Sequence, residues 1–185
     1  MRIVGGDLRG RRIAVPARPD VRPTPDRVRE TLFNWLGQRL DGALCLDLFA
    51  GSGALGFEAA SRGAARVLMV EQDRDVLAAL RKSRDQLGAR AVEIVAGEAL
   101  AWLARGGERF DVVFLDPPFR QNVVAPLLER LAPRLQPGAR VYLEAAQPAD
   151  AAAPWRELKR ARAGQVSYQL LQWSGHDPSG VPGDV

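Results

Sequence analysis

The sequence has a single cysteine and a single histidine among its 185 residues. Cys45 lies in the apolar stretch 43–50, where a lone thiol behaves as a small hydrophobic side chain. His176 lies in a segment rich in glycine and proline. We therefore expect no internal disulfide, no zinc site of cysteine and histidine, no Ser-His-Asp triad and no bound metal.

Long apolar runs are also missing from the chain. No stretch approaches the roughly 18 apolar residues of a transmembrane helix, and the basic N-terminus lacks the apolar core of a secretory signal. Hydrophobic residues make up 46% of the sequence and charged residues 26%, which are ordinary values for a globular protein. We expect a cytoplasmic, monomeric protein that contacts no membrane.

Charge is distributed unevenly along the chain. The net charge is +4, and residues 1–30 alone hold eight arginines against four acidic residues. The rest of the chain is therefore electrically balanced. A neutral body with a basic N-terminal segment favours a polyanionic partner, although charge alone fits a solvated arginine-rich leader equally well.

Alternating patterns predict the fold class. Residues 1–15 hold two short extended segments, 2–4 and 11–15, which predict a hairpin. Thr24 and Pro25 predict the N-cap and first position of a helix that ends at Gly37. Further on, strands alternate with helices, which is typical of an α/β fold with a mostly parallel, Rossmann-like sheet flanked by helices. The expected strands are 44–49, 66–70, 92–95, 112–115 and 139–143, and the expected helices are 54–62, 74–87, 98–104 and 123–131.

The last part of the chain breaks this rhythm. Residues 157–163 and 165–173 are expected to form two strands joined at Gly164, which would add an antiparallel return to the sheet. Residues 174–185 hold three glycines and two prolines and are expected to be a flexible tail. We therefore divide the chain into a basic hairpin and helix extension at 1–40, a main domain at 41–173 and a tail at 174–185.

A glycine-rich loop follows the first buried strand. Gly51, Gly53 and Gly56 fit a pattern in which small residues let backbone N–H groups approach a ligand at a helix N-terminus. Glu71 lies at the end of the next strand, where an acid can accept hydrogen bonds from ribose hydroxyls. These features fit both NAD and S-adenosylmethionine.

Asp47 favours S-adenosylmethionine over NAD. A carboxylate just before the glycines would repel the pyrophosphate of NAD, whereas S-adenosylmethionine presents an ammonium and a sulfonium there. The alternative is that Asp47 only caps the turn. Glu98, after the third strand, is a candidate acceptor for the adenine amino group, or equally an acid that complements the dipole of its own helix.

A second motif, Asp116-Pro117-Pro118-Phe119, follows the fourth strand. Ligands of an open α/β sheet bind at the carboxyl ends of strands, so this motif and Asp47 should border one crevice. The prolines remove two N–H donors, and the resulting rim of acceptors suits an amino group as substrate. The Asp116 carboxylate and the Pro117 carbonyl would accept its two protons and direct the nitrogen lone pair toward a methyl group. Phe119 would stack on a flipped base, or alternatively fill the core beside a rigid turn.

Taken together, these motifs resemble class I methyltransferases that act on amino groups. Residues 1–172 are similar to bacterial 16S ribosomal RNA guanine-N2 methyltransferases of the RsmD type. The resemblance implies a seven-stranded sheet, S-adenosylmethionine as cofactor, and a guanine of 16S rRNA in the small ribosomal subunit or its assembly intermediate as substrate. Besides the core motifs, it is carried by Arg2-Ile3-Val4-Gly5-Gly6, Arg9-Gly10-Arg11, Arg22-Pro23-Thr24, the stretch 26–34 and Ala163-Gly164-Gln165-Val166.

The resemblance also implies roles for individual residues. Expected to bind the cofactor are Asp47, Phe49, Ala50, Gly51, Gly53, Glu71, Gln72, Glu98, Ala99, Thr24 and Arg27. Glu98 departs from the family pattern, which usually has Asn or Asp there. Expected to act on the target base are Asp116, Pro117, Pro118 and Phe119, and expected to contact RNA phosphates are Arg9, Arg11, Arg12 and Arg22.

Three alternatives stay open from the sequence. The Asp-Pro-Pro-Phe turn selects an amino group more than a particular base, so an adenine-N6 methyltransferase acting on DNA or RNA also fits. An NAD-dependent oxidoreductase fits the glycine pattern alone, and a non-enzymatic RNA-binding protein could retain the same fold. Methylation of a pyrimidine C5 is disfavoured, because it needs a cysteine nucleophile and Cys45 lies in a different strand.

Overall fold

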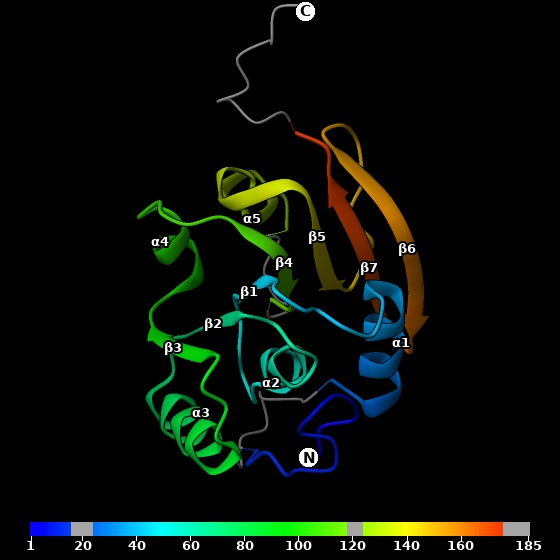
Figure 1. Cartoon of the computed structure of the whole chain (residues 1–185). Helices are drawn as coiled ribbons and strands as arrows, with labels where there is room; N and C mark the ends of the chain where they lie inside the picture. Colours follow the sequence, from blue (N-terminus) through cyan, green and yellow to red (C-terminus); the bar gives the residue numbers. More distant parts are fainter. Residues whose placement is uncertain (16–23, 118–123, 176–185) are drawn as a thin grey trace, which may run out of the picture.

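The computed structural model describes residues 1–15, 24–117 and 124–175. They include a seven-stranded sheet in the order β3-β2-β1-β4-β5-β7-β6 (Figure 1). Strands β1 to β5 run parallel, and β7 runs antiparallel to both of its neighbours, β5 and β6. The mostly parallel sheet and the antiparallel return predicted from the sequence are therefore confirmed.

The predicted strands and helices of the main domain are all present, with ends shifted by a few residues. The strands are Leu44–Asp47 (β1), Arg66–Glu71 (β2), Val92–Ala96 (β3), Phe110–Leu115 (β4), Leu135–Ala145 (β5), Trp155–Ala163 (β6) and Val166–Trp173 (β7). The helices are Asp26–Leu36 (α1), Ala54–Ser61 (α2), Arg74–Leu87 (α3), Ala99–Leu103 (α4) and Val124–Leu131 (α5), with a 3-10 turn at Ala132–Arg134. Within the described ranges, no helix is both long and apolar enough to cross a membrane.

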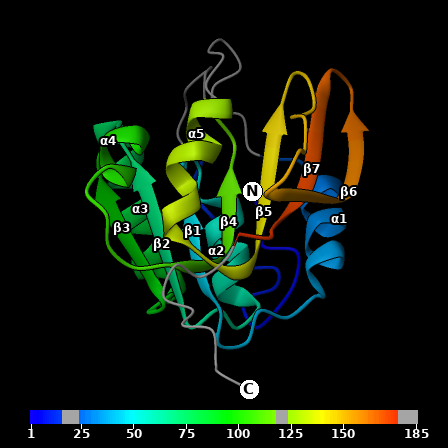
Figure 2. The ribbon, with the colours of Figure 1, turned by 90° about the horizontal axis from the view of Figure 1, so that it is seen from above.

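Helices cover both faces of the sheet and create two separate cores. Helices α1, α2 and α3 pack on one face, where alternate strand residues such as Phe114 and Tyr142 are buried. Helices α4 and α5 pack on the other face against residues such as Leu115 and Leu143 (Figure 2). Because neighbouring residues of a strand point to opposite faces, each central strand contributes to both cores.

Local capping explains why some helix ends were predictable. Helix α3 begins where the Asp73 carboxylate accepts the backbone N–H groups of Asp75 and Val76, and it ends at Gly88. Gly88 has a φ of 64°, a left-handed conformation that glycine adopts without strain. These are standard start and stop signals, and they agree with the bounds predicted from the sequence.

The predicted start of α1 is wrong by one position. Pro25 is the N-cap, no side chain caps the helix, and Thr24 turns its hydroxyl toward Glu144 instead. The Thr24 hydroxyl lies 3.4 Å from a Glu144 carboxylate oxygen. A buried carboxylate needs donors, and this need outweighs the local capping preference of threonine.

The predicted N-terminal hairpin is present as a short antiparallel pairing around a bridge between Arg2 and Arg12. The backbone N–H of Ile3 donates to the Arg11 carbonyl, and that of Ile13 to the Met1 carbonyl, both at 3.0 Å. The loop between them binds α2 instead of forming a longer ladder. The Glu58 carboxylate accepts the backbone N–H groups of Val4, at 2.9 Å, and Gly5, at 2.7 Å. These loop donors are thus used by a buried side chain and are not available for strand pairing.

Glu58 also forms a buried ion-pair network with two arginines. Its oxygens lie 3.2 Å from the Arg29 guanidinium and 2.9 Å from the Arg62 guanidinium, and the side chains of Glu58 and Arg29 are fully buried. Arg29 donates further hydrogen bonds to the carbonyls of Arg2 and Thr24. One of the arginines counted in the basic N-terminal segment is therefore an internal brace and no part of its surface charge.

Candidate functional site

Acidic residues lie at the carboxyl ends of three neighbouring strands. Asp47 ends β1, Asp116 directly follows β4, and Glu144 lies near the end of β5. Asp47 pairs with Phe114 in the register of β1 and β4, and Leu115 pairs with Leu143 in that of β4 and β5. Each acid comes two residues after a strand residue that faces α1, α2 and α3. These strand residues are Cys45, Phe114 and Tyr142. Asp47, Asp116 and Glu144 therefore lie on the same face of the sheet, at the carboxyl ends of its strands, and we call this place the acidic edge. Asp47 and Asp116 border the same region, as predicted.

Asp47 is almost fully buried, with 3% of its surface exposed. Its carboxylate accepts the backbone N–H of Gly56 at 3.0 Å. Burial raises the pKa of Asp47 to about 7, and the charge of Glu71 adds to this, while the N–H groups of Gly56 and Phe49 act in the opposite direction. Asp47 thus does hold the turn, and its ionisation is also sensitive to any charge brought near it.

The glycine loop is fastened to the end of β2 by Glu71. One oxygen of this carboxylate accepts the N–H of Gly51 at 3.0 Å, and the other accepts those of Gln72 and Asp73 at 2.8 and 2.9 Å. Gly51 has a φ of 50° and Gly53 a φ of 78°, which other residues adopt only with strain. The loop is therefore shaped by its glycines and bordered by the carboxylates of Asp47 and Glu71.

This set of groups fits S-adenosylmethionine better than NAD. Carboxylates on both sides of the loop suit a ligand with a positive charge and a ribose diol, and they disfavour a pyrophosphate. The segment after Asp47 contains Phe49 and Ala50, and the residue after Glu71 is Gln72.

Glu98 caps a helix in this structure. It is the N-cap of α4, and its two oxygens accept the N–H groups of Leu100 at 3.0 Å and Ala101 at 2.7 Å. The next residue, Ala99, is buried. Glu98 therefore acts at the helix terminus, as one of its two interpretations expected. Its contact with adenine, and a contact of Ala99 with the cofactor, stay predictions.

Glu144 is a functional candidate that the sequence reasoning missed. It is 8% exposed, and one of its oxygens accepts the hydroxyl of Tyr142 at 2.8 Å as well as that of Thr24. Burial raises the pKa of Glu144, while these two donors counteract it. The signal was available, because Glu144 is an acid near the end of an apolar strand, as are Asp47 and Glu71.

Asp116 is the acid of this group whose surroundings carry the most negative charge. Its pKa is raised well above the ordinary value by burial first, and then by the negative charges of Glu144 and Asp47. Pro117 is buried beside it. Pro118, Phe119 and Arg22 lie outside the described residues, so their expected contacts stay predictions.

The arginines expected to bind RNA differ in their surroundings. Arg9, Arg12 and Arg27 have exposed side chains. Arg11 is also exposed, and its guanidinium donates to the carbonyl of Gln86 at 2.7 Å, which ties the N-terminal segment to α3. The structure therefore brings Thr24 to the acidic edge through Glu144, while Arg27 lies exposed on α1.

Cys45 and potential metal ligands add no further site to the described residues. Burial raises the pKa of the Cys45 thiol to about 12, so it is a poor nucleophile. In the described part of the chain, no group of three or more histidine, cysteine, aspartate or glutamate side chains is arranged to hold a metal ion.

Comparison with known proteins identifies the family of the chain. A family model described as "Conserved hypothetical protein 95" matches residues 1–172. The protein named "Ribosomal RNA small subunit methyltransferase D" of Escherichia coli K12 is 43% identical over 177 residues, which cover 93% of this chain and 89% of that protein. The protein of the same name from Haemophilus influenzae is 41% identical, and the match covers 93% of each chain.

A solved structure supports the same grouping. The proposed methyltransferase yhhF from Escherichia coli superposes with a TM-score of 0.87 at 42% sequence identity, covering 95% of this chain and 99% of that one. The similarity therefore extends over the N-terminal segment, the acidic edge and the antiparallel return alike. The chain belongs to the ribosomal RNA small subunit methyltransferase D (RsmD) family.

Proposed function

We propose that this protein transfers a methyl group from S-adenosylmethionine to the exocyclic N2 of a guanine in 16S rRNA of the small ribosomal subunit. The observation that carries the proposal is the shared edge of Asp47 and Asp116, one acid suited to a cationic donor and the other to an amino group. The names of the relatives support ribosomal RNA as the substrate.

The chain's own groups would hold the cofactor at the glycine loop. S-adenosylmethionine, when bound, supplies a methyl group on a positively charged sulfur. Asp47 provides a buried carboxylate for the cationic part, and Glu71 provides oxygens for the ribose hydroxyls. Gly51 and Gly53 leave room for close backbone approach, and Phe49, Ala50, Gln72, Glu98 and Ala99 would complete the walls.

Asp116 and Pro117 would bind the target amine. The N2 amino group has two protons, and its lone pair is delocalised into the guanine ring. The Asp116 carboxylate and the Pro117 carbonyl would each accept a hydrogen bond from one of the two N–H groups. These two hydrogen bonds favour a pyramidal nitrogen with an available lone pair. Once methylated, this nitrogen must lose one proton, and a carboxylate of raised pKa beside it is a suitable acceptor. Phe119 would stack on the flipped guanine.

The exposed arginines of the N-terminal segment would bind RNA phosphates, and Arg27 of α1 would face the cofactor or the RNA phosphate. Arg9, Arg11, Arg12 and Arg27 are exposed, and Arg22 belongs to the same basic stretch of sequence. Contacts of this kind position an enzyme on RNA without reading its sequence. The substrate is the small subunit or an assembly intermediate of it, which places the reaction in the cytoplasm.

The decisive experiment combines methyl transfer with nucleoside analysis. The purified protein is incubated with labelled S-adenosylmethionine and small subunits that lack the modification. We expect label in 16S rRNA, N2-methylguanosine on digestion and one modified site by reverse transcription. N6-methyladenosine would replace the proposal by the adenine alternative, and a folded protein that labels no RNA would overturn it.

Two controls separate binding from chemistry. Asp116→Ala should abolish turnover while the affinity for S-adenosylmethionine, measured by calorimetry, changes by no more than about twofold, since Asp116 holds the amine. A parallel titration with NAD should give no binding. Equal loss of turnover and cofactor affinity in Asp116→Ala would contradict the assigned role.

A further inference from the structure

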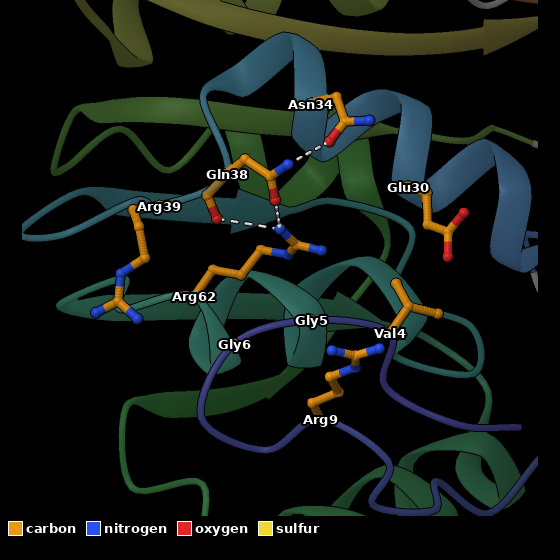
Figure 3. A pocket seen from close by; sticks show the side chains of 9 residues that line it. All are labelled: Val4, Gly5, Gly6, Arg9, Glu30, Asn34, Gln38, Arg39 and Arg62. Atoms are coloured by element: carbon orange, nitrogen blue, oxygen red, sulfur yellow. Dashed lines mark hydrogen bonds between the residues drawn. The ribbon is translucent and has the colours of Figure 1, made fainter.

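A polar cavity lies between the N-terminal loop and α1, apart from the acidic edge. Its volume is about 490 Å³. Residues 4–6 and Arg9 border it on one side, and Glu30 and Asn34 of α1 border it on the other (Figure 3). Arg62, which also borders it, follows the last turn of α2, whereas the glycine loop precedes the first. The cavity is therefore at the opposite end of α2 from the proposed cofactor site.

Arginines dominate the charge of the cavity, and two of the three that border it are paired with acids. Arg62 is paired with the buried Glu58, and Arg39 with Asp41 at 2.7 Å and Asp7 at 3.3 Å. The exposed Arg9 side chain forms no hydrogen bond or ion pair with any other described residue. Arg9 thus offers a full positive charge and a fork of N–H donors to a ligand.

The opposite wall carries groups that suit a nucleobase. Glu30 and Asn34 are one helical turn apart, and both are exposed. The Asn34 side-chain oxygen accepts an N–H of Gln38 at 2.7 Å, which leaves the Asn34 NH2 group free to donate. A carboxylate in this position would repel a second phosphate, whereas carboxylate and amide groups are among the side chains that hydrogen-bond to base edges.

Helix α1 connects this cavity to the acidic edge. Thr24, just before the helix, contacts Glu144 of that edge. From Asp26 to Asn34 the helix axis advances about 12 Å, so one RNA strand can reach both places.

We propose that this cavity binds one nucleotide that flanks the target guanine in the RNA. Arg9 contacts its phosphate, and Glu30 and Asn34 contact the edge of its base. This inference rests on the proposed function, and it adds a second, sequence-reading contact to it.

The test is a set of double-mutant cycles, each of which combines one substitution in the protein with one nucleotide change in the RNA. Arg9→Gln, Glu30→Gln and Asn34→Ala are assayed on small subunits with the wild-type RNA and with each nucleotide near the target changed in turn. The matched control is Arg130→Gln, an exposed arginine on α5, which covers the other face of the sheet. Calorimetry with S-adenosylmethionine checks that each variant is folded and binds cofactor.

Specific results are expected for each change. Arg9→Gln should raise the KM for the subunit about tenfold, keep kcat within about twofold, and reduce the slope of log affinity against log salt by about one. For Glu30→Gln and Asn34→Ala, kcat/KM should fall about tenfold on wild-type RNA. At one flanking position, the RNA change should add nothing further to the loss in these two variants.

Failure of this inference is distinguishable from failure of the proposed function. If the unaltered protein methylates no RNA, the proposed function is overturned. The proposal that the cavity binds a nucleotide is overturned, and the proposed function is not, if the three variants behave like Arg130→Gln. It is also overturned if the effects of the protein and RNA changes are additive at every position. An effect of Arg9→Gln alone would overturn the base contact, and with it the proposed nucleotide site.

Discussion

At the scale of single residues, the acidic edge contains carboxyls whose ionisation depends on burial. Asp47 shows how this affects cofactor binding. An ionised Asp47 attracts the cationic part of S-adenosylmethionine, and a protonated one does not. Because burial raises its pKa to about 7, a large fraction of the protein carries a neutral Asp47 just below neutral pH.

We therefore predict that cofactor affinity falls as the pH is lowered through 7. With a pKa of about 7, the Kd for S-adenosylmethionine should be about twentyfold higher at pH 5.5 than at pH 7.5. Calorimetry in two buffers of different protonation enthalpy should detect proton release on binding near pH 7. Asp47→Asn should bind more weakly at pH 7.5, with little further change at pH 5.5. A wild-type Kd that is the same at both pH values would show that Asp47 does not meet the cation.

A second prediction concerns Glu144. Asp116 must be ionised to accept a hydrogen bond, and later a proton, from the amine, so kcat should fall as the pH drops through the raised pKa of Asp116. Glu144→Gln removes a negative charge that contributes to this shift and keeps an oxygen for Tyr142. The acidic limb of the kcat profile should therefore move to lower pH, by about one unit. An unmoved limb, at unchanged cofactor affinity, would mean that Glu144 has no electrostatic role in turnover.

At the scale of helices and strands, sequence patterns predicted what local chemistry decides. The bounds of α3 follow from a capping aspartate and a terminal glycine, and the strands follow from apolar runs. The start of α1 was not predicted correctly and the hairpin is shorter than expected, because Thr24 bonds to Glu144 and the loop N–H groups bond to Glu58. Both partners are distant in sequence, and no local pattern reveals such pairing. For the same reason, Asp47 and Asp116 were predictable from strand ends, whereas the Thr24–Glu144–Tyr142 contacts were not.

The buried pair of Arg29 and Glu58 joins α1, α2 and the N-terminal loop, and it gives a prediction at this scale. Arg29→Met removes one partner of a fully buried ion pair, which should lower the free energy of unfolding by about 3–5 kcal/mol. Urea denaturation followed by circular dichroism measures this change. Arg39→Met is the matched control, because its ion pairs are exposed, and it should have a much smaller effect. Similar effects of the two substitutions would show that burial of the network contributes little to stability.

At the scale of the whole molecule, the basic N-terminal segment has two roles that the sequence did not separate. Its charge suits a polyanion, but Ile3 and Ile13 belong to the same hydrophobic core as residues of α1, α2 and α3, with 1% and 2% of their surfaces exposed. The loop between them supplies the two N–H groups that Glu58 accepts. The segment is therefore a structural part of the molecule as well as a candidate contact for RNA.

Deleting residues 1–15 and neutralising their charge should thus have different consequences. Deletion exposes core surface and removes donors from a buried carboxylate, and a loss of about 5 kcal/mol would lower Tm by about 10–20 °C. Arg9→Gln combined with Arg12→Gln changes only exposed side chains and should leave Tm within about 2 °C. The double variant should instead weaken RNA binding and reduce its salt slope by about two. Thermal denaturation and RNA titrations at several salt concentrations measure both effects. A deletion variant as stable as the intact protein would show that the segment is a removable arm, and an unchanged salt slope would show that these two arginines do not bind RNA.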